Sequence, residues 1–145
     1  MDHPISKETR RYNYLLGEID AVYHEISLKL GLSDSVMRIL YTICDKGDCC
    51  PLKDICRLSG ISKQTINSAL RKLEAEKIVY LKPSGAKNKN VCLTEKGKQL
   101  ADQTARQIIC AENMILTSWP KEDVEKYLEL TERFLNELKE KSENM

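Results

Sequence analysis

Several features that would assign a protein to a membrane or to export are missing from this sequence of 145 residues. No apolar run approaches the roughly 18–20 residues that a membrane-spanning helix needs. The N-terminus also lacks the apolar core of a signal peptide. We therefore expect a cytoplasmic protein that does not contact a membrane.

The usual patterns of catalysis and metal binding are missing as well. The six glycines are scattered rather than gathered into a loop that could cradle phosphate, and no Ser or Cys stands in a recognisable nucleophile setting. There are two histidines and no Cys-x-x-Cys pair, so a zinc site of the usual spacing is not expected. The sequence predicts no enzyme, no cofactor and no metal.

Cysteine is present six times, although the sequence has no motif that uses it. Thiols of a cytoplasmic protein are normally reduced, and free cysteine is commonly buried. We therefore expect six reduced thiols, several at helical core positions: Cys44, Cys49, Cys50, Cys56, Cys92 and Cys110.

Charge is nearly balanced overall, at +1, but it is unevenly placed. Residues 61–98 hold nine Lys or Arg and three acids, whereas residues 112–145 hold five Lys or Arg and nine acids. A basic segment with a compensating acidic tail is typical of a protein that presents one face to nucleic acid.

The basic segment begins with a pattern typical of a capped helix. Ser59-Gly60 is a turn signal, and Ser62 is a good N-cap. Three apolar residues then recur at helical spacing and form an inward face: Ile66, Leu70 and Leu73. The opposite face is polar and cationic, which suits base edges and phosphates in a major groove.

The remaining elements are predicted from periodicity and turn signals. We expect helices over residues 9–30, 34–45, 51–58, 62–74 and 94–118, and a last helix from residue 121. A short extended stretch at residues 49–50 and strands at 78–82 and 91–93 complete the pattern, with a turn-rich basic loop at 83–90.

A short helix, a glycine turn, a polar helix and a basic hairpin together predict a winged helix-turn-helix. The expected fold is mainly α: a lobe at residues 33–97 with a small two- to three-stranded β wing, and long helices at 5–31 and 98–142. The apolar stripes of these end helices exceed what one small lobe covers. We expect them to form a dimerisation region.

With these elements the sequence resembles the MarR family of bacterial transcriptional regulators. The resemblance rests on residues 61–74, on the strand Ile78-Val79-Tyr80-Leu81 and above all on Leu93-Thr94-Glu95-Lys96-Gly97. It covers nearly the whole chain, as one MarR-type domain over residues 1–145. It implies a homodimeric repressor that binds a palindromic operator with its helix and wing. Such regulators are often released from DNA by a small phenolic or lipophilic ligand.

Candidate site residues follow from the polar faces and from the aromatic residues near the end helices. Contacts to bases are predicted for Gln64, Thr65, Asn67, Ser68 and Arg71. Contacts to phosphate and wing contacts are predicted for Ser62, Lys63, Lys72, Lys87, Asn88 and Lys89. A ligand cavity could be lined by Tyr12, Tyr23, Met37, Tyr41 and Trp119.

Two alternatives stay open. A thiol-based redox regulator would use Cys49-Cys50. The reactivity of these thiols requires exposure and a lowered pKa, and a sequence supplies neither. A winged-helix module for protein contacts would never bind DNA and would lack a salt-dependent affinity for it. One departure from the family is Lys77, where the family usually has glycine, so we expect this helix to end without a left-handed cap.

Overall fold

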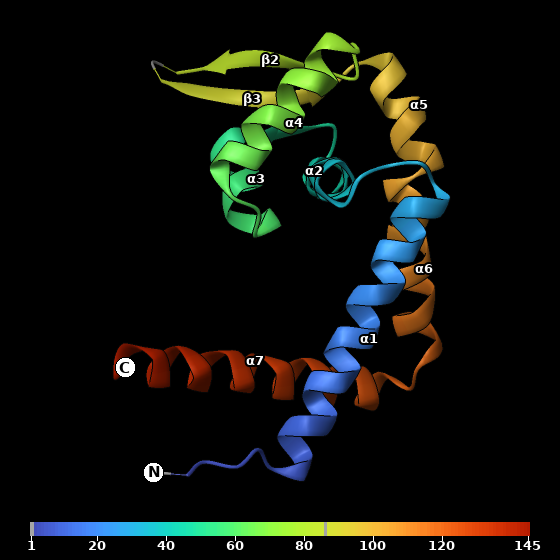
Figure 1. Cartoon of the computed structure of the whole chain (residues 1–145). Coiled ribbons are helices and arrows are strands. Elements are labelled where there is room, and N and C mark those ends of the chain that lie inside the picture. Colours follow the sequence, from blue (N-terminus) through green and yellow to red (C-terminus); the bar gives the residue numbers. More distant parts are fainter. Residues whose placement is uncertain (1, 86) are drawn as a thin grey trace. The chain divides into compact units, whose positions relative to one another are not determined.

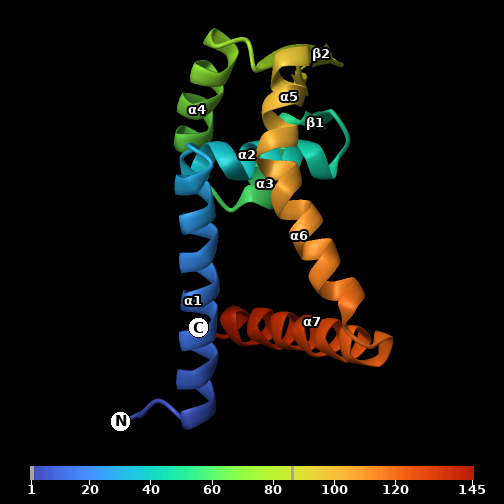
Figure 2. The ribbon, with the colours of Figure 1, turned by 90° about the vertical axis from the view of Figure 1, so that its right-hand side faces the viewer.

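The structure is a computed structural model that describes residues 2–85 and 87–145. It confirms the predicted class, mainly helical with one small antiparallel sheet (Figures 1 and 2). Ala86, in the predicted wing tip, lies outside the described residues. Among the described helices, none has the length and apolar character needed to cross a bilayer. The elements are α1 (Lys7–Lys29), α2 (Asp34–Asp45), β1 (Cys49–Pro51), α3 (Leu52–Ser59), α4 (Lys63–Ala75), β2 (Val79–Ser84), β3 (Asn88–Leu93), α5 (Glu95–Gln103), α6 (Ala105–Ser118) and α7 (Lys121–Glu143).

The chain divides into two compact units, Met1–Gln107 and Ile108–Met145. The first unit contains α1 to α5 and the sheet, and its core gathers around α2. The second unit contains most of α6 and all of α7, where the rings of Trp119 and Tyr127 meet edge to face. The largest fully buried side chains all lie in the first unit: Ile39, Leu40, Ile43, Ile55, Ile66, Val79, Val91, Cys50 and Cys92.

Local capping signals determine where the helices begin. Ser62 is the N-cap of α4 as predicted, and Ser33 and Thr94 cap α2 and α5; each side-chain oxygen accepts a backbone N–H from the first turn. The first helix starts at Lys7, two residues before the predicted position, because Ser6 caps it by accepting the Thr9 N–H at 3.0 Å.

The sheet has the strand order β1-β3-β2, with both neighbours antiparallel. The hairpin strands are longer than predicted: Ser84 pairs with Asn88 and Pro83 with Lys89, so most of residues 83–90 is strand rather than loop. Pro83 is tolerated because β2 is an edge strand. Pro51 likewise ends β1 and does not begin α3.

The predicted long helix at residues 94–118 is wrong, because two helices, α5 and α6, occupy this range. The break is at Thr104, whose φ of −131° and ψ of −92° are not helical. The Thr104 hydroxyl donates to the Leu100 carbonyl at 2.7 Å, a local bond that competes with regular helix geometry.

The prediction that α4 ends without a left-handed cap is also wrong. Lys77 has a φ of 61°, in the left-handed region. The N–H of Ile78 bonds the Leu73 carbonyl at 2.8 Å, and the N–H of Lys77 bonds that of Glu74 at 3.0 Å. These two bonds are the Schellman pattern, which here holds a lysine where glycine would be more comfortable.

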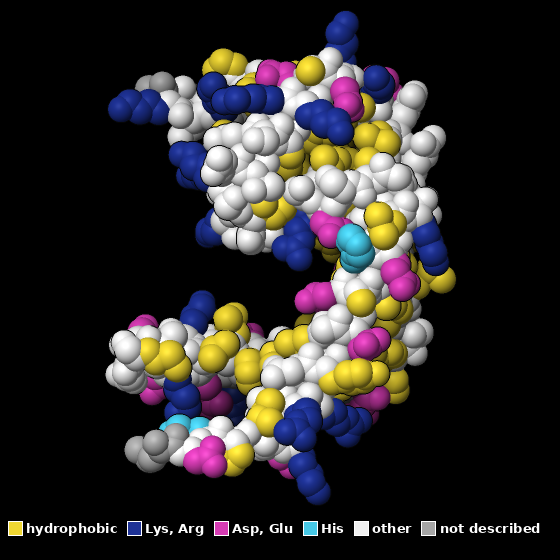
Figure 3. Space-filling model, viewed as in Figure 1, with side chains coloured by type: hydrophobic (Ala, Val, Ile, Leu, Met, Phe, Trp, Pro, Cys, Tyr) yellow, Lys and Arg dark blue, Asp and Glu magenta, His cyan; other side chains and the backbone are white. Residues whose placement is uncertain are grey.

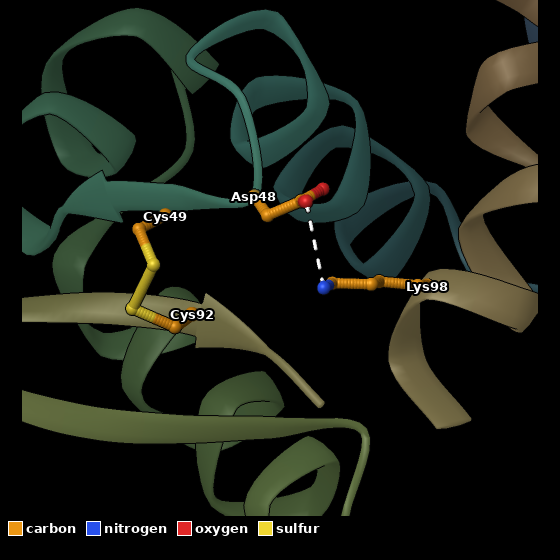
Figure 4. The surroundings of a disulfide bond; sticks show 4 residues. All are labelled: Asp48, Cys49, Cys92 and Lys98. Carbon is orange, nitrogen blue, oxygen red and sulfur yellow. Dashed lines mark ion pairs between the residues drawn. A yellow bond between two sulfur atoms is a disulfide. The ribbon is translucent and has the colours of Figure 1, made fainter. Parts of the chain in front are cut away.

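The expectation of six reduced thiols is wrong for two of them. Cys49 of β1 and Cys92 of β3 form a disulfide, as direct partners in the antiparallel register (Figure 4). Local sequence patterns do not reveal which strands pair, so they could not bring together two cysteines 43 positions apart. The four free cysteines are Cys44, Cys50, Cys56 and Cys110.

Candidate nucleic-acid interface

The turn before α4 holds this helix at a defined angle to α3. Gly60 ends α3 with a φ of 69°, a left-handed conformation that glycine adopts without strain. The guanidinium of Arg38 donates from Nη1 to the Ser59 carbonyl at 2.9 Å, and Ser59 Oγ accepts the Ile61 N–H at 3.3 Å. No local sequence pattern indicates that Arg38, on α2, supports this turn.

The two faces of α4 are divided as predicted. Ile66, Leu70 and Leu73 are buried against the lobe. Of the predicted DNA contacts on α4, Asn67 is half-buried and the rest are exposed: Ser62, Lys63, Gln64, Thr65, Ser68, Arg71 and Lys72. Ser62 Oγ accepts the Thr65 N–H and donates to Thr65 Oγ1 at 2.9 Å, so this hydroxyl is engaged in the helix cap.

Cations on α4 and on the hairpin have no acidic partner among the described residues. Some basic side chains elsewhere are paired, as in Arg106 with Asp48 at 3.0 Å. α4 also has no acid in its first turn, where its free N–H groups carry positive partial charge. The helix therefore presents an uncompensated positive face. The predicted cationic DNA contacts all lack an ion pair with the described residues: Lys63, Arg71, Lys72, Lys87 and Lys89.

The hairpin that follows α4 carries its lysines on different faces. Successive side chains of a strand point to opposite sides, so Lys89 shares the face of β3 that buries Val91 and Leu93. Lys82 of β2, opposite Asn90 in the register, belongs to the other face. β2 packs against α4, and dark blue Lys side chains project from the hairpin in Figure 3. Lys89 therefore lies on the same side of the sheet as the helices.

Asp48, which precedes β1, anchors the base of the wing. Its carbonyl accepts the Leu93 N–H at 2.8 Å, and its carboxylate pairs with Lys98 at 3.7 Å (Figure 4). Arg106 donates to the same carboxylate at 3.0 Å. No local sequence pattern reveals this cluster, because Asp48 precedes β1 whereas Lys98 and Arg106 lie on α5 and α6.

The step from the wing into α5 explains the Leu-Thr-Glu-Lys-Gly pattern. Thr94 Oγ1 donates to the Lys77 carbonyl at 2.5 Å and accepts the Gly97 N–H at 3.0 Å. Lys96 Nζ donates to the Glu76 carbonyl at 3.0 Å. A Cβ at Gly97 would collide with the carbonyl oxygen of Ile78. The motif thus fastens α5 to the end of α4.

The predicted ligand residues are distributed over both units. Tyr12 and Tyr23 lie on α1, and Met37 and Tyr41 on α2, within the first unit, whereas Trp119 belongs to the second. Met37 is buried and Tyr41 half-buried. In the described part of the chain, no group of three or more His, Cys, Asp or Glu side chains is placed to hold a metal ion. His24 instead pairs with Asp34, with 2.7 Å between Nδ1 and Oδ2.

Comparison with known proteins gave a match to a family model over part of the chain, and a known fold. Residues 30–87 match the model of the MarR family. A MarR-family transcriptional regulator from Silicibacter pomeroyi has a similar structure, with a TM-score of 0.69 and 20% identity over 89% of this chain and 88% of that one. NadR in complex with 4-hydroxyphenylacetate has a TM-score of 0.68 and 17% identity over 95% and 96% of the two chains. The S. aureus MepR–DNA complex has a TM-score of 0.67 and 18% identity over 93% and 99%. A sequence search of curated proteins found no match.

Proposed function

We propose that this chain, whose residues 30–87 match the model of the MarR family, is a transcriptional regulator that binds specific sequences of double-stranded DNA. The observation that carries the proposal is the positive face of α4, exposed and without acidic partners among the described residues. A helix of this size and polarity fits the major groove.

The proposed contacts to DNA divide by chemistry into those that recognise bases and those that bind the sugar-phosphate backbone. Arg71 matches guanine, and Gln64 and Asn67 match adenine, because their paired polar atoms fit these base edges. Lys63 and Lys72 neutralise phosphates beside the helix, and Lys89 does so from the wing. The MepR–DNA complex shows that a protein of similar fold binds DNA.

The regulator acts as a homodimer on a palindromic operator. The support is the apolar surface of the long helices: no residue of α7 is buried within one chain, although it carries six large apolar side chains. Yellow hydrophobic side chains are visible on the long helices in Figure 3. A second copy would cover such a surface and place two α4 helices about 34–36 Å apart, in successive major grooves. The exposed large apolar side chains on α7 are Tyr127, Leu128, Leu130, Phe134, Leu135 and Leu138.

The regulator is a repressor released by a small phenolic or lipophilic ligand. NadR was solved with a phenolic acid, 4-hydroxyphenylacetate, which supports this class of effector for a similar fold. Aromatic side chains on α1 and α2 supply apolar surface with polar tips, which suits a phenol.

Selection of bound sites from a random duplex library with the purified full-length protein tests the function. We expect a palindromic consensus whose half-sites are one helical turn apart, and binding that weakens steeply with salt because counterions are released. A protein-interaction module would show no salt-dependent DNA binding. A consensus with a single half-site would support sequence-specific DNA binding but would contradict the proposed dimer.

A further inference from the structure

The Cys49–Cys92 disulfide closes a loop that contains the whole proposed DNA-binding surface. Its two ends are 43 positions apart in the sequence, and α3, α4 and β2 lie between them. Cys49 begins β1, three residues before α3 starts at Leu52, and Cys92 stands three residues after Lys89 on β3. The bond therefore ties the helix-turn-helix to the wing at one point.

The disulfide is accessible to solvent from one side. β1 is an edge strand, and Cys49 is exposed, whereas Cys92 is only 1% exposed. Of the two cysteines, Cys49 is therefore the one that we expect an external thiolate to attack. Disulfides of this kind, open on one side, are the ones that exchange with small thiols.

Neighbouring thiols do not compete for this bond. Cys50 adjoins Cys49 in the sequence, but neighbouring side chains of a strand point to opposite faces, and Cys50 is fully buried. Burial raises the pKa of the Cys50 thiol to about 11, and burial also raises the pKa of Cys44. Both stay protonated at neutral pH and are poor nucleophiles.

We propose that Cys49–Cys92 is a thiol–disulfide exchange site that controls DNA binding, with the disulfide form as the tight-binding state. This inference rests on the proposed function and adds its regulation. The physical reason is preorganisation: the bond keeps Lys89 at a defined distance from α4, so less freedom is lost when both contact one duplex.

The exchange conserves atoms and electrons. The thiolate of a small thiol attacks Cys49 Sγ, the bond between the two cysteines breaks, and Cys92 leaves as a thiolate that takes a proton. A second small thiol then attacks the mixed disulfide at the sulfur of the first, and Cys49 leaves as a thiol. The protein disulfide is reduced by two electrons, and the two small thiols are oxidised to one disulfide. Oxidised glutathione drives the reverse reaction.

Reduction loosens the wing without dismantling it. The β1–β3 ladder, the Leu93–Asp48 hydrogen bond and the Asp48–Lys98 ion pair all persist when the sulfurs separate. We therefore expect a moderate effect, a loss of DNA affinity of about tenfold, which is within the usual range of coupling between two sites.

Fluorescence anisotropy with the selected duplex tests the proposal on full-length protein equilibrated with reduced or oxidised glutathione. Alkylation and mass spectrometry establish the state of each thiol. Wild type should bind about tenfold more tightly when oxidised. Cys49→Ser, at an exposed position, should bind like reduced wild type in both buffers, and Cys110→Ser, at an exposed free thiol, should behave like wild type.

Equal affinities in the two states, or tighter binding by the reduced form, would overturn this inference while leaving the proposed function intact. Absence of salt-dependent DNA binding by the oxidised protein would overturn the proposed function, and the control by Cys49–Cys92 with it. A Cys49→Ser variant that still responds to glutathione would place the control at another cysteine.

Discussion

Lys77 is the one non-glycine residue with a positive φ in the described part of the chain, at 61°. A side chain in the left-handed region costs about 1–2 kcal/mol relative to a right-handed conformation. Two Schellman hydrogen bonds and the bond from Thr94 Oγ1 to the Lys77 carbonyl hold it there. The chain accepts this strain at the point where α4 turns into the wing.

Lys77→Gly should therefore raise the free energy of unfolding by about 1 kcal/mol, because glycine adopts this conformation without strain. Urea unfolding of the purified variant measures the change. Lys77→Ala keeps the strain and removes the charge, so it should leave the stability near that of wild type. Equal gains from both substitutions would assign the effect to the charge instead.

Gly97→Ala should destabilise the protein by about 1–3 kcal/mol, because the added methyl group would collide with the backbone carbonyl of Ile78, which cannot move aside alone. Gly17→Ala is the matched control: nothing lies within 4 Å of a Cβ there, inside the helix α1. It should stabilise by about 0.5–1 kcal/mol. Thermal unfolding compares the two, and a neutral Gly97→Ala would contradict the close approach.

At the scale of elements, α4 and the hairpin divide sequence recognition from backbone binding. α4 is rigidly held, since it is capped by Ser62, buried through Ile66 and Leu70 and fastened at its end to α5. Lys89 lies toward the tip of the hairpin, where β3 pairs with β2 but is beyond its pairing with β1. We therefore expect substitutions on the two elements to have different signatures.

Arg71→Ala should lower affinity for the selected duplex by about 1–3 kcal/mol and relax the preference at one base position. Repeating the site selection with the variant measures both effects. Arg57→Ala removes an exposed arginine from α3, where Arg57 pairs with Asp54 at 3.5 Å, and should leave the preference unchanged. An equal loss of affinity for every sequence would indicate that Arg71 contacts phosphate and not a base.

Lys89→Ala should weaken binding to all sequences alike and lower the salt slope by about one charge. Lys82→Ala, on the opposite face of the same hairpin, is the matched control and should change the slope less. Salt titrations with operator and random duplex give both slopes. Equal slopes for the two variants would show that the face of the hairpin does not matter.

At the scale of the whole molecule, one covalent bond spans much of the first unit. The loop that it closes covers residues 49–92. In the chain-entropy model, closing a loop of this length stabilises the folded protein by about 4 kcal/mol, because the unfolded chain loses freedom. The stability of this unit thus depends on the redox state of two residues.

Reduction of the disulfide should lower the free energy of unfolding by up to about 4 kcal/mol. Urea unfolding with and without dithiothreitol measures the loss, and Cys49→Ser should reproduce it in both buffers. Cys110→Ser, in the second unit, should have no effect. An unchanged midpoint after verified reduction would contradict the loop-closure argument.

Much of the architecture was predictable because its signals are local. Ser33, Ser62 and Thr94 act on amide groups within their own first turn, and the apolar spacing of Ile66, Leu70 and Leu73 requires no knowledge of distant residues. The order of a short helix, a glycine turn, a polar helix and a basic hairpin was therefore visible in the sequence. The roles of single residues in binding DNA remain predictions.

Tertiary structure alone decided the features that join distant segments. Whether Cys49 meets Cys92 depends on the register between β1 and β3, and whether Asp48 meets Arg106 depends on the path of α6. Lys77 is left-handed because Thr94 and the Schellman bonds hold it, against its own preference. Sequence by itself determined which segments are helices and which face of each is apolar, since both depend on neighbours a few residues away. Partners brought together by packing have no such local signal, and only the folded chain could reveal them.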